Sequence, residues 1–203
     1  MFSLIFSMFT FSLSMSISPG PVNITILSSS MNYGLKQTFA FISGATIGFT
    51  ALLAAVCFGL YQVISLYPIL LNIITVLGTG LLVWMGWNIA RAQGESIQTD
   101  QLELPKAPSF MQGALLQWLN PKAWIAAVSG TALFSASHNA LYLFLFILIY
   151  FVVCYLSLLI WGYAGQKLAV FLNQGSRMRV FNMVMGVLLM FIALQMSWSH
   201  FYA

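Results

Sequence analysis

The chain has 203 residues, 61% of them hydrophobic and only 5% charged, with seven Lys or Arg and three Asp or Glu. A soluble domain carries about a quarter charged residues, which cover its water-facing surface. The composition therefore excludes a cytosolic enzyme, a secreted domain and a nucleic-acid-binding protein. A membrane helix needs ~20 apolar residues, so the apolar residues suffice for about six spans and leave no room for a soluble catalytic domain.

Six apolar runs divide the chain, at about residues 2–30, 38–61, 68–90, 111–134, 140–163 and 180–202. We predict one all-α integral membrane domain, 1–203, with six transmembrane helices. The only long polar stretch, Arg91 to Ser109, holds all three acidic residues and two prolines. Its composition predicts a flexible linker over about 91–110.

Two runs are interrupted by proline. Ser18-Pro19-Gly20-Pro21 breaks the first run and Asn120-Pro121-Lys122 breaks the fourth. Proline removes a backbone donor, and orphaned backbone groups are tolerated in a membrane only where protein or a wet cavity satisfies them. A simple kink in a packed helix is the alternative interpretation of each break.

The two halves of the chain, about 1–90 and 111–203, each have three runs and each open with a broken one. Because three helices per half is an odd number, a duplicated half must insert upside down. We therefore predict a 3+3 inverted repeat with broken helices 1 and 4, a plan that recurs in secondary transporters.

Basic residues mark alternate connections between the runs. Lys36 follows the first run, Arg91 and Lys106 follow the third, and the fifth is followed by Lys167, Arg177 and Arg179. The other two connections and both tails have no Lys or Arg. The positive-inside rule places the basic loops in the cytoplasm, so both termini are expected on the outer side of the membrane.

Lys122 is the most informative side chain in the sequence. It lies about 11 residues inside the fourth run, on the order of 16 Å deep, which is beyond the reach of a snorkelling lysine. No Asp or Glu occurs in any of the six runs. We expect its partner to be an anionic group of a ligand; backbone carbonyls at the Pro121 kink are the alternative.

The points where the broken helices begin again also favour an anionic ligand group beside Lys122. Asn120 followed by Pro121 is typical of a helix start, as are Ser18-Pro19 and Gly20-Pro21. Each start exposes N–H groups and the positive end of a helix dipole, which suit a carboxylate. The side chains of Asn23, Gln117 and Asn120, with the carbonyls released at the breaks, could accept hydrogen bonds from an ammonium group. Together these groups favour a zwitterionic amino acid, although Asn23 and Gln117 also fit interhelical packing.

Other chemistries have weaker support. Cys57 and Cys154 are isolated in apolar runs, with no histidine nearby, so neither a disulfide framework nor a metal site is predicted. A divalent metal-ion exporter would need ligand clusters inside the helices, and a hydrolase would need a base beside Ser129. A non-transporting structural membrane protein is a further alternative.

Gly44 and Gly48 form a GxxxG pair, a motif that allows two helices to pack closely. A homodimer through this pair is possible.

These residues resemble a known family. Ser18-Pro19-Gly20-Pro21-Val22-Asn23, Gly44 with Gly48, and Gln117-Trp118-Leu119-Asn120-Pro121-Lys122-Ala123-Trp124 are similar to motifs of the LysE/RhtB amino-acid exporters, in length, helix count and order. The stretch Ser129 to Phe134 replaces a Pro-Gln-Phe triplet that many members have, and it resembles the branch associated with cysteine and O-acetylserine export.

The resemblance implies a multi-pass protein of the bacterial inner membrane that exports small neutral amino acids or derivatives and uses the proton gradient. Candidate substrates are cysteine, O-acetylserine, threonine and homoserine. It implies a substrate site at Pro19, Gly20, Pro21, Asn120, Pro121 and Lys122, to which the residues themselves add Asn23 and Gln117. No cofactor is implied. Because no helix contains a carboxylate, proton coupling would act through Lys122 or through ionisation of the substrate.

Overall fold

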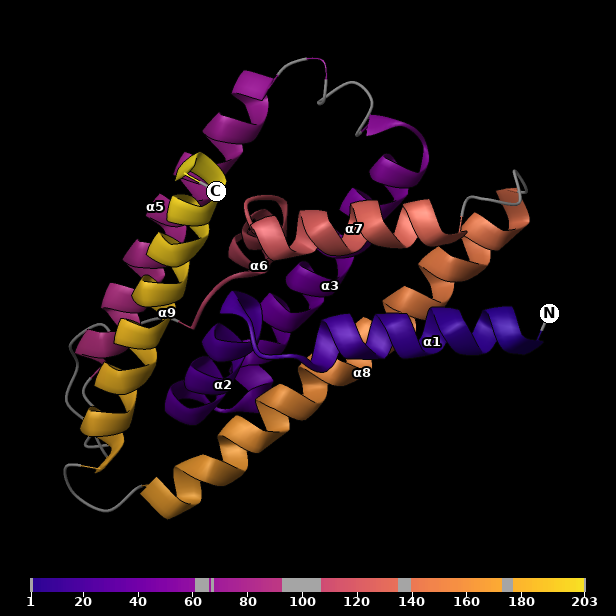
Figure 1. Ribbon diagram of the computed structural model, residues 1–203. Coiled ribbons are helices and arrows are strands. Elements are labelled where there is room, and N and C mark those ends of the chain that lie inside the picture. Colours follow the sequence, from indigo (N-terminus) through magenta and orange to yellow (C-terminus); the bar gives the residue numbers. More distant parts are fainter. Residues whose placement is uncertain are drawn as a thin grey trace.

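The computed structural model describes residues 2–60, 66, 68–92, 107–134, 140–172 and 177–202, and every regular element in this part of the chain is helical. Eight α-helices lie in it (Figure 1): α1 (Phe2–Ile17), α2 (Pro21–Tyr33), α3 (Leu35–Cys57), α5 (Pro68–Arg91), α6 (Phe110–Trp118), α7 (Pro121–Phe134), α8 (Ala140–Leu172) and α9 (Arg177–Tyr202). The predicted all-α class is confirmed.

Four of these helices are long and apolar enough to cross a membrane alone: α3, α5 from Asn72 onward, α8 and α9. α1 and α2 together form a fifth candidate span, bent by 59° at the break between them. With 9 and 14 residues, α6 and α7 are each too short for a hydrocarbon core of about 30 Å. The described residues thus hold four to five candidate spans, and the predicted fourth span corresponds to the α6–α7 pair.

The helix boundaries follow the predicted runs with two differences. The break expected between residues 30 and 38 is reduced to Gly34, because α2 continues to Tyr33 and α3 begins at Leu35. α8 continues to Leu172, whereas the fifth run was expected to end near residue 163. Gly165, Gln166 and Lys167 interrupt the apolar run there, although Leu168 to Leu172 are apolar again and continue the helix. Most of the predicted linker, residues 93–106, lies outside the described residues.

Small residues bring α3 and α6 into backbone contact. A Cβ added to Gly48 would lie 2.6 Å from Cα of Ala114, and one added to Gly44 would clash with the carbonyl of Phe110. Gly113 of α6 meets the backbone of α3 at Phe41 in the same way. The GxxxG face is therefore used inside the chain, and a homodimer through Gly44 and Gly48 has no free surface there.

α5 and α9 form a second close pair, side by side on the left of Figure 1. They cross where Gly86 faces Gly186, and a Cβ on Gly86 would lie 2.8 Å from the carbonyl oxygen of Gly186. The third and sixth runs, one from each half of the chain, are thus packed against each other.

An aromatic cluster fills the space between α1, α3, α7 and α8. Its five members are Phe11, Phe49, Phe134, Phe146 and Tyr150. Neighbouring ring centroids are 4.5 Å apart for Phe49 and Tyr150 and 4.7 Å apart for Phe134 and Phe146. Phe146 is fully buried. These distances are those of favourable offset or edge-to-face ring pairs, so the cluster is closely packed.

Basic side chains lie at helix ends that gather on one side of the molecule. Arg91 ends α5 and stacks over Trp87 at 4.3 Å, while Lys167, near the end of α8, lies 5.3 Å from the ring centre of Tyr163. The ends of α5 and α8 and the start of α9, at Arg177, all lie at the lower end of Figure 1. This is the grouping that the charge count predicts for one face of a membrane protein.

Candidate functional site

The two proline breaks come together in space. α2 begins at Pro21 and α7 at Pro121, so both prolines occupy the first helical position, where the missing N–H costs nothing. Asn120 caps α7: its Oδ1 accepts a hydrogen bond from the backbone nitrogen of Lys122 at 3.1 Å. Gly20 precedes α2 and has no side chain to cap it. The first N–H groups of α2 therefore have no capping side chain.

Side chains satisfy the carbonyls that α1 releases at its end. The hydroxyl of Ser18 donates to the carbonyl of Met15 at 3.2 Å. Nδ2 of Asn23 donates to the carbonyl of Ser16 at 3.0 Å. Because Asn23 belongs to α2, this second bond joins the two halves of the broken span.

Three more carbonyls are satisfied from distant parts of the chain. Nε1 of Trp161, in α8, donates to the carbonyl of Ile17 at 3.1 Å. Nζ of Lys122, in α7, donates to the carbonyl of Ser18 at 2.8 Å, to its hydroxyl oxygen at 2.9 Å and to the carbonyl of Pro19 at 3.4 Å. Five consecutive carbonyls, those of residues 15–19, thus have side-chain donors, as irregular backbone at membrane depth requires.

Lys122 contacts only neutral oxygens among the described residues. Backbone carbonyls do hold the ammonium, as the alternative interpretation expected, but they belong to the break near Pro19 instead of the one at Pro121. The three acidic residues of the chain lie in 93–106, outside the described residues. The Lys122 charge is therefore solvated by dipoles and not matched by a carboxylate of any described residue.

Gly20 allows the lysine to approach. A Cβ at this position would lie 3.0 Å from Nζ and 3.1 Å from Cδ of Lys122, and 3.6 Å from Oδ1 of Asn23. The backbone of Gly20 is extended, with φ −166°, which any residue can adopt. The position favours glycine for its lack of a side chain and not for its backbone angle.

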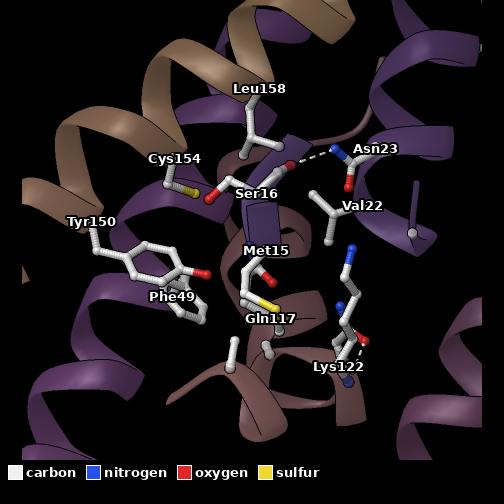
Figure 2. A pocket seen from close by; sticks show the side chains of 14 residues that line it. Met15, Ser16, Val22, Asn23, Phe49, Gln117, Lys122, Tyr150, Cys154 and Leu158 are labelled. Atoms are coloured by element: carbon white, nitrogen blue, oxygen red, sulfur yellow. Dashed lines mark hydrogen bonds between the residues drawn. The ribbon is translucent and has the colours of Figure 1, made fainter. Parts of the chain in front are cut away.

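A cavity of about 40 Å³, called the central cavity below, lies between the breaks (Figure 2). α1, α2, α3, α6, α7 and α8 all contribute to its wall, which consists of Met15, Ser16, Gly20, Val22, Asn23, Phe49, Gln117, Asn120, Lys122, Ala123, Ala126, Tyr150, Cys154 and Leu158. In Figure 2, Lys122 and Asn23 lie on one side of it and Tyr150, Cys154 and Ser16 on the other. A water molecule needs about 10–15 Å³, so a bound amino acid requires this cavity to widen.

The structure brings together five of the eight residues proposed from the sequence. Gly20, Asn23, Gln117, Asn120 and Lys122 all line the central cavity. The three prolines do not line it: Pro21 and Pro121 begin helices, and the exposed Pro19 contributes its carbonyl to Lys122.

Sequence reasoning missed the opposite wall of the cavity. Tyr150, Cys154 and Leu158 follow one another at intervals of four residues on α8, so they share one helix face. Cys154, for which the sequence predicted neither a disulfide nor a metal site, is buried and lines the cavity. Tyr150 and Cys154, two polar groups one turn apart in a long apolar run, hint that this face is not exposed to lipid, but they do not indicate which helices it packs against.

The helices offer no metal site in their described parts, where no three His, Cys, Asp or Glu side chains come together. Of the two cysteines, Cys57 contacts Oγ1 of Thr131 at 3.2 Å, and both are free thiols. His200 contacts Oδ1 of Asn72 at 2.9 Å, at the end of the chain far from the two breaks in sequence.

Comparison with known proteins agrees with the geometry. The model of the LysE type translocator family matches residues 13–199. A cysteine/O-acetylserine efflux protein of Escherichia coli O1:K1 / APEC is 27% identical over 135 residues, which cover 65% of this chain and 66% of the relative. A protein of the same description from Salmonella typhimurium is 24% identical over 132 residues, 64% of this chain and 65% of the relative. The chain thus spans about two thirds of the length of these relatives.

No solved structure matches the chain. The family match covers most of the sequence and includes both proline breaks and all eight proposed site residues. The chain belongs to the LysE type translocator family, and it is accordingly a membrane transporter and not an enzyme.

Proposed function

We propose that the protein exports small neutral amino acids or their derivatives across the bacterial inner membrane and binds them in the central cavity. The observation that carries this proposal is the environment of Lys122. Its ammonium is held only by neutral oxygens of the described chain, beside a helix start that has no side-chain cap. A carboxylate would be a stronger partner than these dipoles, because it adds the attraction of a full opposite charge to the hydrogen bonds of the ammonium.

The other end of a zwitterion also has partners in this cavity. Asn23 uses its Nδ2 to hold the carbonyl of Ser16, which leaves its Oδ1 as an acceptor beside Gly20. Oδ1 of Asn23 and Nζ of Lys122 both lie within 3.6 Å of the Cβ position of Gly20. An α-amino acid carries its ammonium and carboxylate on one carbon atom, so this close pair of complementary groups suits its backbone.

The side chain of the substrate would face the opposite wall. This wall carries the polar groups of Ser16, Tyr150 and Cys154 and no charged residue. A small side chain that is neutral and polar fits it, which agrees with cysteine, O-acetylserine, threonine or homoserine as candidate substrates. The curated relatives are described as cysteine/O-acetylserine efflux proteins, which adds support to the first two.

The membrane topology belongs to the same proposal. Six spans in a 3+3 inverted repeat would make α1–α2 the counterpart of α6–α7, α3 that of α8, and α5 that of α9. The packing of α5 against α9 and of α3 against α8 supports this relation, since equivalent helices meet across a repeat axis. Basic ends on the cytoplasmic side would place both termini outside.

Protons are the coupling ion that we propose. The described helices contain no Asp or Glu, so a carboxylate relay has no residue there. Coupling would act through Lys122, whose ammonium could lose its proton when the substrate leaves, or through the ionisation of the substrate itself.

The experiment is efflux of preloaded radiolabelled serine, cysteine, O-acetylserine and threonine from cells that express the protein. Lys122→Ala should lower the export rate at least tenfold while the protein stays in the membrane. Lys167→Ala removes the same charge at the basic helix end and is the matched control, with export within twofold of the wild type. Equal export by Lys122→Ala and wild type would reject the binding role of the lysine.

A further inference from the structure

A second cavity of about 100 Å³ lies between α2, α5 and the start of α6. Its wall consists of Thr25, Ser28, Ser29, Asn32, Tyr33, Trp84, Met85, Asn88, Ile89, Ala92, Pro108 and Gln112. It shares no residue with the central cavity and is more than twice as large. We propose that this second cavity is the site where a net-neutral amino acid binds on its way from the cytoplasm to Lys122; the identity of the cargo rests on the proposed function.

The two cavities follow one another along the same pair of helices. On α2, Val22 and Asn23 line the central cavity, and Thr25 begins the wall of the second. On α6, Gln117 lines the central cavity and Gln112 the second. From Asn23 to Thr25 the helix rises about 3 Å, so along α2 less than one helical turn separates the cavities.

Hydroxyl and amide groups continue this path along α2. Thr25, Ser28 and Ser29 are each less than 4% exposed, although serine and threonine usually lie at protein surfaces. With Asn32 they occupy positions 25, 28, 29 and 32, the spacing of one helix face. Thr25 donates its hydroxyl proton to the carbonyl of Pro21 at 2.9 Å, and the side chain of Asn32 is hydrogen-bonded to that of Asn182. A polar solute would therefore meet the acceptor oxygen of Thr25 and the hydroxyls of Ser28 and Ser29.

The charges around the second cavity indicate the class of solute. Among the residues that the structure describes, none that lines this cavity carries a charge. The nearest guanidinium along α5, that of Arg91, lies over the ring of Trp87 at 4.3 Å, and neither residue lines the cavity. A solute with a net charge would find no counter-charge in this wall, whereas a zwitterion of net charge zero can be held by hydroxyls and amides.

The opposite side of the central cavity is closed. There Phe49 and Tyr150, which line the cavity, continue into Phe11, Phe134 and Phe146 of the aromatic cluster. The ring centre of Phe11 lies 5.9 Å from that of Phe134 and 6.1 Å from that of Phe146. A polar solute therefore has a hydroxyl-lined route from the side of the basic helix ends and a packed aromatic barrier on the other.

Cysteine labelling with a membrane-impermeant, positively charged methanethiosulfonate tests this proposal. Ser29→Cys places a thiol in the wall of the second cavity. Ser30→Cys is the matched control: Ser30 is equally buried, but it faces α8, where its Oγ lies 3.2 Å from the Cβ position of Gly162. Asn88→Cys, on the α5 wall, is a second probe if Ser29→Cys does not fold. Labelling of the wild type measures the reaction of the two native thiols, Cys57 and Cys154.

The Ser29→Cys variant should react at least tenfold faster than Ser30→Cys in inverted membrane vesicles, and it should not react in intact cells. L-serine at millimolar concentration should slow this labelling severalfold, whereas cationic L-lysine should not. Reaction from the outer side only, or a rate no higher than that of Ser30→Cys, would overturn the proposed route. Equal protection by L-lysine would overturn the net-neutral class.

Labelling reports access and does not require transport. If the protein exported none of the amino acids tested, the labelling pattern would still establish or reject the route. If export were normal and Ser29→Cys remained unlabelled from the cytoplasmic side, only the inference about the second cavity would fail.

Discussion

Lys122 donates a hydrogen bond of 2.8 Å to the carbonyl of Ser18, so the side chain that follows one helix break holds the end of the other. The contact joins residues 104 positions apart. It makes the two breaks a single structural unit, in which a change at one affects the geometry of the other. Four predictions test this unit and the packing around it.

Replacing Asn23 with aspartate should inhibit transport without unfolding the protein. The new carboxylate would lie beside Lys122, since both groups flank Gly20, and would compete with the carboxylate of the substrate. We expect KM for efflux to rise at least tenfold. Asn23→Ala is the comparison: like Asn23→Asp it loses the bond that Nδ2 donates to the carbonyl of Ser16, which should cost about 1–3 kcal/mol of stability in both variants, but it adds no carboxylate beside Lys122. An unchanged KM in Asn23→Asp would contradict the proposed position of the substrate.

Gly20→Ala should lower transport severalfold at nearly unchanged stability. Its Cβ would lie 3.0 Å from Nζ of Lys122 and would displace the ammonium. Gly34→Ala provides the contrast: Gly34 has φ +82° and open space around its Cβ position. That substitution should cost about 1–3 kcal/mol through backbone strain and leave transport per folded molecule intact. Thermal unfolding in detergent, paired with efflux rates, separates the two effects.

Gly130→Ala should loosen the aromatic cluster. The added Cβ would lie 2.5 Å from Cζ of Phe146 and 2.9 Å from Cε1 of Phe11, so the rings must move. We expect the thiol of Cys154 in the central cavity to become reactive from the outer side, measured with an impermeant reagent on intact cells in a Cys57→Ser background. A further Cys154→Ala change should abolish the signal. No increase over the Gly130 parent would show that the cluster is not the barrier on this side.

Gly48→Ala should destabilise the fold by about 1–3 kcal/mol, the usual cost of overpacking. Its Cβ would lie 2.6 Å from Cα of Ala114, which is backbone and cannot rotate away. Gly80→Ala is the control, since nothing lies within 4 Å of its Cβ position and alanine favours the helix. If Gly48→Ala changed only the oligomeric state and left unfolding unaltered, the GxxxG face would act between chains instead of within one.

Much of the fold could be predicted from the sequence, because each helix in a membrane must satisfy its own backbone and be apolar over most of its length. Because of that requirement, the apolar runs that begin at residues 38 and 68 predict membrane helices. Prolines at 19, 21 and 121 predict breaks in such helices. The extension of α8 to Leu172 was missed because Gly165, Gln166 and Lys167 interrupt the apolar run before the last five residues of the helix.

The site was harder to predict. A lysine without a carboxylate is visible in the sequence, and so is the capping role of Asn120. The carbonyl of Ser18 could not be predicted as the acceptor, because every residue has a backbone carbonyl and the sequence does not show which one accepts a given bond. Tyr150 and Cys154 reach the cavity only through the packing of α8 against α1 and α2, a long-range arrangement that local patterns do not encode.

The bonds at the end of α1 have a consequence for biosynthesis. A chain is made from its N-terminus, so the carbonyls of Ile17 and Ser18 enter the bilayer before their donors exist. Trp161 and Lys122 are synthesised 144 and 104 residues after their respective acceptors. The break between α1 and α2 is therefore inserted before all of its hydrogen bonds can form. Its final geometry is reached only when α7 and α8 have been synthesised and have packed beside it.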